Sequence, residues 1–242
     1  MNTLEQLAEF YKTDKQASEH NYVKFYENYL SQYRNSQINL VEIGILEHPD
    51  KVTRPFGAAS LRLWADYFPN AAIHGIDISD LKHLQEDRIK IYVGDQNKPE
   101  ELKKIFEENN LRPNIIIDDG SHFHKHQQTS FVTLFDYLVS DGLYIIEDIA
   151  HFELVNNEVT PGNFFPNENT PQLVFSSSIS SHPICNNLTL SVLMRYCVTK
   201  KIESFFIPID LGESVEQNIE FCNIHRSNMF DKYIAFIKKK GN

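Results

Sequence analysis

The sequence predicts an α/β protein with a Rossmann-like, seven-stranded, mostly parallel sheet and helices on both faces. Three observations support this fold class. Apolar runs alternate with amphipathic segments, as in a parallel sheet covered by helices. Glycine or acidic residues follow most of the apolar runs, where parallel sheets bind ligands. The 242 residues are enough for one such domain.

The first part of the chain has the most regular pattern. An apolar run at 38–44 ends in Gly44, and a segment with helical spacing at 58–68 stops before Pro69. The other strands are expected at 72–78, 89–93, 113–118 and 143–147, and the other helices at 99–109 and 125–139. Right-handed crossovers place the first and fourth strands side by side, with a ligand-binding switch point between them.

The second part is less regular. Residues 149–187 are rich in Asn, Pro and Ser and are expected to be irregular; a loop that folds over the acceptor and an ordinary surface loop are the two interpretations of this segment. A helix is expected at 188–199, and strands at 204–209 and 232–238 complete the sheet as a hairpin-like pair. Residues 1–35 are expected to form a helical cap on a ligand-binding domain at 36–242, together a single domain.

Composition restricts the classes of partner. The formal net charge of −10 argues against nucleic acid and anionic membranes. Three widely spaced cysteines, Cys185, Cys197 and Cys222, indicate neither a disulfide framework nor a zinc site, which favours a reducing compartment. No run approaches the roughly 20 apolar residues of a membrane span, and the first residues do not read as a signal peptide. We therefore expect a cytoplasmic protein with a small-molecule substrate, and leave a homo-oligomer open.

Strand ends in the first half predict an adenosine site. Glu42 and Gly44 close the first strand, where glycine lets a ligand approach the backbone. Asp77 closes the second strand and can accept hydrogen bonds from ribose hydroxyls, while Asp95 and Gln96 follow the third strand near an adenine. No G-x-G-x-x-G pattern is present to bind a pyrophosphate, so S-adenosylmethionine is favoured over NAD.

The next two strand ends predict a metal site beside a base. Asp118, Asp119 and His122 follow one apolar run, and Glu147 and Asp148 follow the next. Neighbouring strands lie about 4.8 Å apart, so their terminal carboxylates can share one ion. Oxygen ligands without cysteine favour Mg²⁺, with Mn²⁺ or Ca²⁺ as alternatives. The imidazole of His122 suits general-base work at neutral pH.

Other interpretations of these residues stay open. Asp118 or Asp119 could cap the following helix, and the strand-end acids could be solvated. Asp119, His122 and His126 could form the facial triad of an Fe(II) oxygenase. A non-catalytic subunit that binds S-adenosylmethionine is a third alternative.

Several segments resemble the sugar O-methyltransferases of the macrocin and mycinamicin type, which have the class I S-adenosylmethionine-dependent fold. They are residues 11–15 (YKTDK), 20–22 (HNY), 40–44 (LVEIG), 60–70 (SLRLWADYFPN), 94–96 (GDQ), 118–122 (DDGSH) and 142–148 (GLYIIED). The resemblance covers residues 11–149. The DDGSH run paired with a later Glu-Asp is its most specific part.

The resemblance implies Mg²⁺-dependent methylation of a hydroxyl on a sugar or a glycosylated natural product. It implies Asp119, Glu147 and Asp148 as metal ligands and His122 as the general base. Implied contacts with S-adenosylmethionine fall on Tyr22, Gly44, Ser60, Asp77, Asp95, Gln96 and Asp118. In this interpretation two neighbouring hydroxyls chelate the ion, and a catechol would present two oxygens in a similar way.

Overall fold

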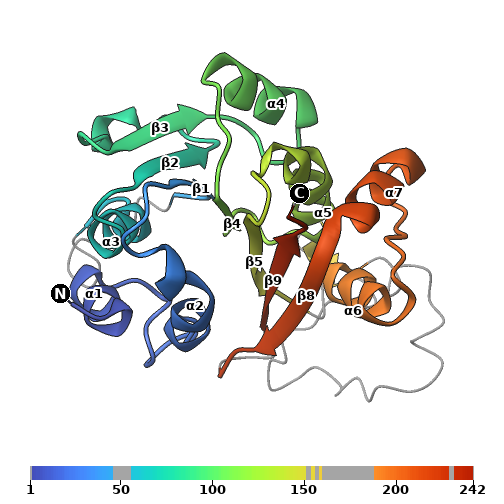
Figure 1. Ribbon diagram of the computed structural model, residues 1–242, viewed down its shortest axis with the longest axis horizontal. Helices are drawn as coiled ribbons and strands as arrows, with labels where there is room; N and C mark the ends of the chain where they lie inside the picture. The colour runs from blue at the N-terminus through green and yellow to red at the C-terminus, as the bar shows by residue number, and fades with distance from the viewer. Residues whose placement is uncertain are drawn as a thin grey trace.

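The computed structural model describes residues 2–45, 56–150, 154–155, 158–159, 188–228 and 232–241. Its main sheet has seven strands in the order β3-β2-β1-β4-β5-β9-β8 (Figure 1). The strands are β1 (Asn39–Ile43), β2 (Ala72–Asp77), β3 (Ile89–Val93), β4 (Ile115–Asp118), β5 (Leu143–Ile149), β8 (Ile219–Arg226) and β9 (Tyr233–Lys239). Strands β1 to β5 are parallel, and β9 runs antiparallel to both β5 and β8. The predicted fold class is confirmed.

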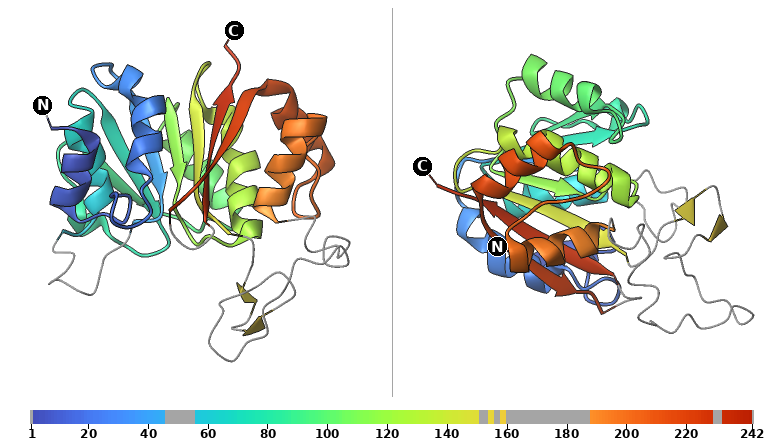
Figure 2. Two further views of the ribbon diagram at one scale, coloured as in Figure 1. Left: turned by 90° about the horizontal axis from the view of Figure 1, so that it is seen from below. Right: turned by 90° about the vertical axis from the view of Figure 1, so that its right-hand side faces the viewer.

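Helices cover both faces of this sheet (Figure 2). The α-helices are α1 (Leu4–Tyr11), α2 (Val23–Leu30), α3 (Ala59–Tyr67), α4 (Pro99–Glu108), α5 (His124–Leu134), α6 (Thr189–Thr199) and α7 (Ile209–Asn218). Short 3₁₀ turns lie at Ser31–Tyr33, Lys82–Leu84 and Phe135–Tyr137, and β6 (Leu154–Val155) and β7 (Glu158–Val159) form a separate two-stranded sheet.

Alternating side chains divide the interior into two hydrophobic cores. Ile115 and Ile117 of β4 belong to the core under α1, α2 and α3, whereas Ile116 belongs to the core under α4 to α7. This alternation follows from the two-residue period of a strand. It explains why β4 is apolar at three consecutive positions: the strand is buried on both faces.

One predicted strand is misplaced. The sixth strand of the sheet is β8 at Ile219–Arg226, not 204–209. Residues 204–208 lead into α7, which begins directly after Pro208, a residue without an N–H to donate to a strand ladder. The side chain of Phe205 is 88% exposed, so this apolar run is not a buried strand.

The strand order brings the ends of β1, β2 and β4 together. Strand β1 lies between β2 and β4, and Ile43 pairs with both Ile76 and Asp118. The loops that follow these strands therefore emerge at one edge of the sheet. Among the described residues no helix is both long and apolar enough to span a bilayer.

Candidate active site

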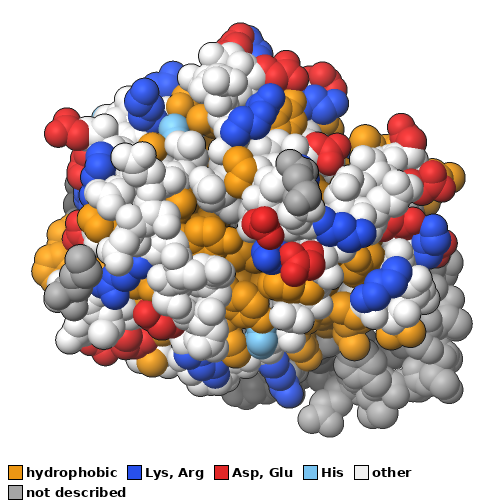
Figure 3. All heavy atoms as spheres, viewed as in Figure 1, with side chains coloured by type: hydrophobic (Ala, Val, Ile, Leu, Met, Phe, Trp, Pro, Cys, Tyr) orange, Lys and Arg blue, Asp and Glu red, His pale blue; other side chains and the backbone are white. Residues whose placement is uncertain are grey.

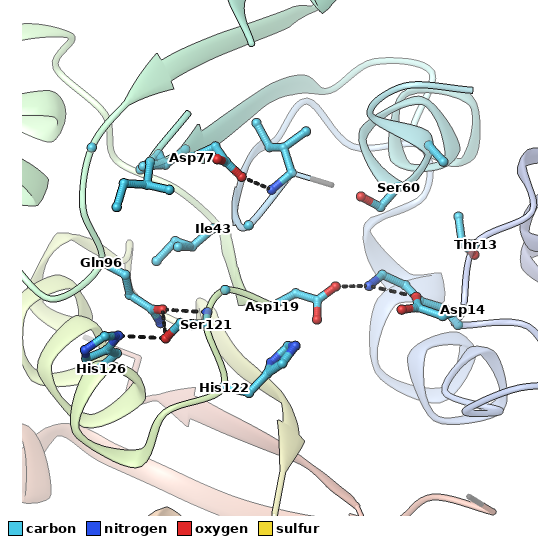
Figure 4. A pocket seen from close by; sticks show the side chains of 18 of the residues that line it. Thr13, Asp14, Ile43, Ser60, Asp77, Gln96, Asp119, Ser121, His122 and His126 are labelled. Carbon is cyan, nitrogen blue, oxygen red and sulfur yellow. Dashed lines mark hydrogen bonds and ion pairs between the residues drawn. The ribbon is translucent and has the colours of Figure 1, made fainter. Parts of the chain in front are cut away.

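A cavity of about 360 Å³ opens at the carboxyl ends of the parallel strands (Figure 4). Its walls come from the ends of β1 to β4 and from residues 12–15, which lie between α1 and α2. The volume lies within the roughly 300–1,000 Å³ of small-molecule sites. Its place is the switch point of the sheet, where the chain order reverses between β1 and β4.

Gly44 lets the loops after β1 and β4 approach closely. Its φ is +91°, and a Cβ atom there would lie 2.1 Å from the backbone oxygen of Asp119. A side chain at position 44 would therefore push these two loops apart. The glycine is required by the backbone geometry of the site.

Asp77 stands at the cavity wall with its carboxylate held by the backbone. Its Oδ2 accepts from the N–H of Ile45 at 2.7 Å, and its Oδ1 accepts from the N–H of Ser79 at 2.8 Å. Each oxygen retains a lone pair for a ligand hydroxyl. Asp95 is held in a similar way by the N–H of Asn97, at 2.9 Å from its Oδ1.

Gln96 and Asp118 organise the wall from behind. The Nε2 of Gln96 donates to the Oδ1 of Asp118 at 2.6 Å, and its Oε1 accepts from the N–H of Ser121 at 3.0 Å. Asp118 is fully buried and also accepts from the hydroxyl of Ser130. Burial raises the pKa of Asp118 to about 7, although the bonds from Ser130, Gly120 and Gln96 oppose this shift. Asp118 is thus a support for the 118–122 loop.

The predicted metal residues lie where β4 and β5 end. Glu147 and Asp148 are consecutive, so a regular strand would point them to opposite faces. Asp148 instead has a φ of +52°, and the pairing of β5 with β9 shifts register between Ile146 and Ile149. This bulge allows both carboxylates to contact the N-terminal segment at the same edge of the sheet.

Two overlapping groups in the described part of the chain have the spacing for a metal ion. Asp119, His122 and Asp148 form one, and Glu42, Asp119 and Glu147 form the other, with all ligand atoms of each group within 4.8 Å of one another. The three predicted metal residues are therefore divided between groups that share Asp119. Carboxylates, one imidazole and no thiolate fit a hard divalent cation.

A buried lysine, which the sequence analysis did not single out, lies within this acid cluster. The Nζ of Lys15 is 2.6 Å from the Oδ2 of Asp119, 2.9 Å from the Oε1 of Glu147 and 3.7 Å from the Oε1 of Glu42. Burial raises the pKa values of Asp119 and Glu147, and Lys15 opposes this shift in both. Burial would lower the pKa of Lys15, but the charges of Asp119 and Glu147 raise it well above its usual value. Lys15 therefore stays protonated.

Asp148 is surrounded by donors from distant parts of the chain. Its Oδ1 accepts from the hydroxyl of Tyr22 at 2.7 Å and lies 3.0 Å from the Nδ1 of His20, while Lys232 pairs with its Oδ2. Burial alone would raise the pKa of Asp148, but His20, His122 and Lys232 lower it well below its usual range. The sequence places His20 in a segment that resembles the family but does not indicate its contact with Asp148, and Lys232 carries no signal, because both contacts join distant segments.

His122 lies on the loop after β4, with a φ of +61° and a side chain that is 40% exposed. Its Nε2 is 3.6 Å from the Oδ2 of Asp148. Its Nδ1 has no hydrogen-bond partner within the described residues. The ring can therefore accept a proton while the nearby carboxylate stabilises the resulting charge.

The structure argues against two alternatives. His126 lies inside α5, where its Nδ1 is 2.7 Å from the Oγ of Ser121, and no described metal-spaced group contains it, so the iron triad is not assembled. Phe123 is the N-cap residue of helix α5, and no side chain caps this helix within the described residues. Neither Asp118 nor Asp119 therefore serves as its cap.

The predicted cofactor residues fall into two sets. Gly44, Ser60, Asp77, Asp95 and Gln96 line the cavity. The other three are buried behind its wall: Tyr22 against Asp148, Glu42 near Lys15, and Asp118 against Gln96. These three support the site and do not face the cavity.

Known proteins match this chain in sequence and in fold, although no family model matches it. Demethylmacrocin O-methyltransferase of Streptomyces fradiae is 39% identical over 164 residues, which is 66% of this chain and 40% of that protein. Mycinamicin VI 2''-O-methyltransferase of Micromonospora griseorubida is 40% identical over 149 residues, 60% of this chain and 36% of that protein. The matches thus span about two fifths of these relatives.

A solved structure shows the same relationship. The MycE methyltransferase from the mycinamycin biosynthetic pathway, in complex with Mg, SAH and mycinamycin VI, superposes with a TM-score of 0.71 at 27% identity. The superposition covers 99% of this chain and 55% of MycE. The resemblance drawn from the sequence is confirmed: the chain is a homologue of the macrocin- and mycinamicin-type sugar O-methyltransferases and has the class I S-adenosylmethionine-dependent methyltransferase fold.

Proposed function

We propose that this protein is an S-adenosylmethionine- and Mg²⁺-dependent O-methyltransferase that acts on a hydroxyl of a sugar or glycosylated natural product. The observation that carries the proposal is a cluster of three carboxylates beside His122, next to a cavity at the switch point of the sheet: Asp119, which lines the cavity, and the buried Glu147 and Asp148. The relatives named above are sugar O-methyltransferases, and MycE was solved with Mg and SAH.

The cavity fits the adenosine part of the cofactor. Asp77, held by two backbone N–H groups, offers its remaining lone pairs to the ribose hydroxyls. Asp95 and the loop held by Gln96 lie where the base would bind, and Gly44 allows the loops after β1 and β4 to approach each other at the cavity. We propose that this part of the molecule binds and orients the methyl donor.

Asp119, Glu147 and Asp148 are the residues that would hold the metal, and their oxygen atoms suit Mg²⁺. A bound divalent cation supplies Lewis acidity that favours loss of a proton from a hydroxyl. The chain's own contribution is to hold these carboxylates in place, to lower the pKa of Asp148, and to oppose the rise that burial causes in the pKa values of Asp119 and Glu147. Tyr22 and His20 hold Asp148, and Lys15 holds Asp119 and Glu147.

His122 is proposed as the general base. It removes the proton of the acceptor hydroxyl, and the oxygen forms a bond to the methyl carbon while the bond from that carbon to sulfur breaks. The donor leaves as neutral S-adenosylhomocysteine, and the proton stays on His122, whose charge Asp148 stabilises. General-base catalysis of this type contributes roughly 10²–10⁴-fold to the rate.

The acceptor is proposed to present two neighbouring oxygens, as a sugar diol does. The two relatives described above are named for demethylmacrocin and mycinamicin VI, and a third, of Streptomyces olivaceus, is named for a rhamnosyl tetracenomycin C, which favours glycosylated natural products over catechols. Acidic and basic side chains are interspersed on the face shown in Figure 3, and the net charge is −10, which is unfavourable for nucleic acid. We further propose residues 1–35 as a helical cap on the domain at 36–242, and a cytoplasmic location from the cysteine pattern.

The test measures transfer of a labelled methyl group from S-adenosylmethionine to a panel of glycosylated macrolides, rhamnosylated polyketides and simple catechols. We expect transfer to glycosylated acceptors, loss of transfer in EDTA and recovery with Mg²⁺. Calorimetry should show binding of S-adenosylhomocysteine. Full activity in EDTA would exclude the metal role, and transfer to catechols alone would exclude the sugar acceptor.

A further inference from the structure

The acid cluster already contains a positive charge that belongs to the chain. The side chain of Lys15 is 1% exposed, and its ammonium group contacts the carboxylates of Asp119 and Glu147 at 2.6 and 2.9 Å. The carboxyl groups of Glu42 at 3.7 Å and Asp14 at 4.0 Å also lie near this ammonium group. An ammonium group buried among four acids compensates charges that would be costly to bury alone.

The residues that Lys15 contacts are also proposed ligands of the divalent cation. Asp119 belongs to both metal-spaced groups of the described residues. Glu147 belongs to the group with Glu42, whose carboxylates surround the ammonium group of Lys15. A cation at these oxygens would need lone pairs that Lys15 now uses. It would also place two positive charges beside an ammonium group, and like charges at such distances repel strongly in a partly buried site.

The backbone at Lys15 is held independently of its ammonium group. It lies in the segment at 12–15 that lines the cavity, and its backbone oxygen accepts from the N–H of Val23 at 3.1 Å at the start of α2. Rotations of its long side chain can withdraw the ammonium group while this backbone bond stays. Tyr26, which donates to Glu147, would remain to hold that carboxylate.

We propose that Lys15 and the divalent cation compete for Asp119 and Glu147. Lys15 then serves as a resident counter-ion that keeps the acid cluster stable before metal binds and that lowers the affinity for the metal. This inference rests on the metal site of the proposed function. Lys15 is a positioning residue, because it acts on the reaction through the carboxylates.

The opposite role predicts an effect of opposite sign. If Lys15 supported the metal by holding the carboxylates in place, its removal would weaken metal binding. If Lys15 competes, its removal strengthens metal binding, because Asp119 and Glu147 become fully available. Metal affinity therefore distinguishes the two roles without a measurement of activity.

The experiment is calorimetric titration of MgCl₂ into wild-type protein and the Lys15→Met variant, with MnCl₂ as a second probe. Removal of a charge a few ångströms from the ion should lower the dissociation constant at least about tenfold. Without metal, the thermal unfolding midpoint of Lys15→Met should be lower than that of the wild type. Addition of Mg²⁺ should raise the midpoint of the variant by more than it raises the midpoint of the wild type. Lys104→Met removes an exposed lysine paired with Glu108 and should match the wild type.

A second variant serves if Lys15→Met fails to fold. Lys15→Gln removes the positive charge, keeps a side chain that can donate a hydrogen bond to a carboxylate, and keeps Glu42, Asp119 and Glu147 of the metal-spaced group. We expect the same increase in Mg²⁺ affinity. Unchanged or weaker binding in either folded variant would overturn the inference while the proposed metal site stands.

The remaining outcomes separate the two proposals. Binding by the variant without binding by the wild type would support the inference and refute Mg²⁺ dependence of the natural protein. Binding by neither would refute both.

Discussion

The two halves of the site are held together in different ways. At the ends of β1 to β3, the proposed cofactor half uses backbone donors: Asp77 is fixed by the N–H groups of Ile45, which follows the neighbouring strand β1, and of Ser79, two residues further along the chain. At the ends of β4 and β5, the catalytic half depends on distant residues, and Lys15 and Tyr22 reach Glu147 and Asp148 from the N-terminal segment. Changes in the first half should therefore act on binding, and changes in the second on turnover and on charge balance.

The largest effect is expected for Asp119→Asn, in the catalytic half. Asp119 belongs to both metal-spaced groups, so the variant should lose metal-dependent turnover by roughly 10³-fold, since several kcal/mol of charge stabilisation disappear. Steady-state kinetics across a Mg²⁺ titration measures this loss. Asp87→Asn removes an exposed acid outside the cavity and should leave kcat unchanged. An Asp119→Asn enzyme with normal kcat and normal Mg²⁺ dependence would contradict the assignment of metal binding to the ends of β4 and β5.

Next is His122→Ala, which should lower kcat by roughly 10²–10⁴-fold because the general base is absent. Binding of S-adenosylhomocysteine should stay within about threefold of the wild type, since adenosine contacts belong to the other half. Single-turnover kinetics and calorimetry separate the two effects. His83→Ala, at an exposed position, is the control. Equal losses in binding and turnover would show that the halves are not independent.

A smaller effect is expected for Asp77→Asn. The amide keeps one acceptor but loses charge-assisted bonds to the ribose, worth about 1.5–3 kcal/mol, so affinity for S-adenosylmethionine should fall roughly 10- to 100-fold. At saturating cofactor, kcat should approach the wild-type value. Asp80→Asn, on the exposed loop that follows, is the control. A loss of kcat at saturating cofactor, with unchanged affinity for S-adenosylmethionine, would contradict the assignment of Asp77 to cofactor binding.

The smallest effect concerns stability against pH and lies in β2, away from the acid cluster. Burial lowers the pKa of His74 to about 4, below its unfolded value of about 6.5. The unfolded chain therefore binds a proton first, so His74 should favour the folded state above pH 6.5 and lose this contribution as the pH falls towards 4. Urea unfolding of wild type and His74→Gln between pH 4 and 7.5 measures it. Identical pH dependence in both proteins would show that His74 does not titrate in this way.

The sequence predicts features that depend on local pattern. Alternating apolar runs located β1 to β5 and β9, and strand-end chemistry located Gly44 and Asp77 at the cavity. The edge strand β8 was missed because its Glu, Asn and His residues dilute the apolar signal, whereas 204–209 has a denser apolar run that leads into a helix.

In the proposed catalytic half, the sequence predicted the carboxylates but not the side chains that contact them. Lys15, His20 and Lys232 reach the acids only because the chain folds back on itself, and a single sequence has no periodicity that reports such contacts. Tyr22, Glu42 and Asp118 were expected at the cofactor, but they lie buried behind the cavity, because a motif gives the chain position of a residue and not the direction of its side chain.

The bulge in β5 has a consequence for any attempt to transplant this chemistry. Two adjacent acids reach the same edge of the sheet because the main chain at Asp148 takes a left-handed turn, with a φ of +52°. Grafting Glu-Asp onto a regular strand of another scaffold would send one carboxylate into the opposite layer. A designer would have to copy the irregular backbone together with the side chains.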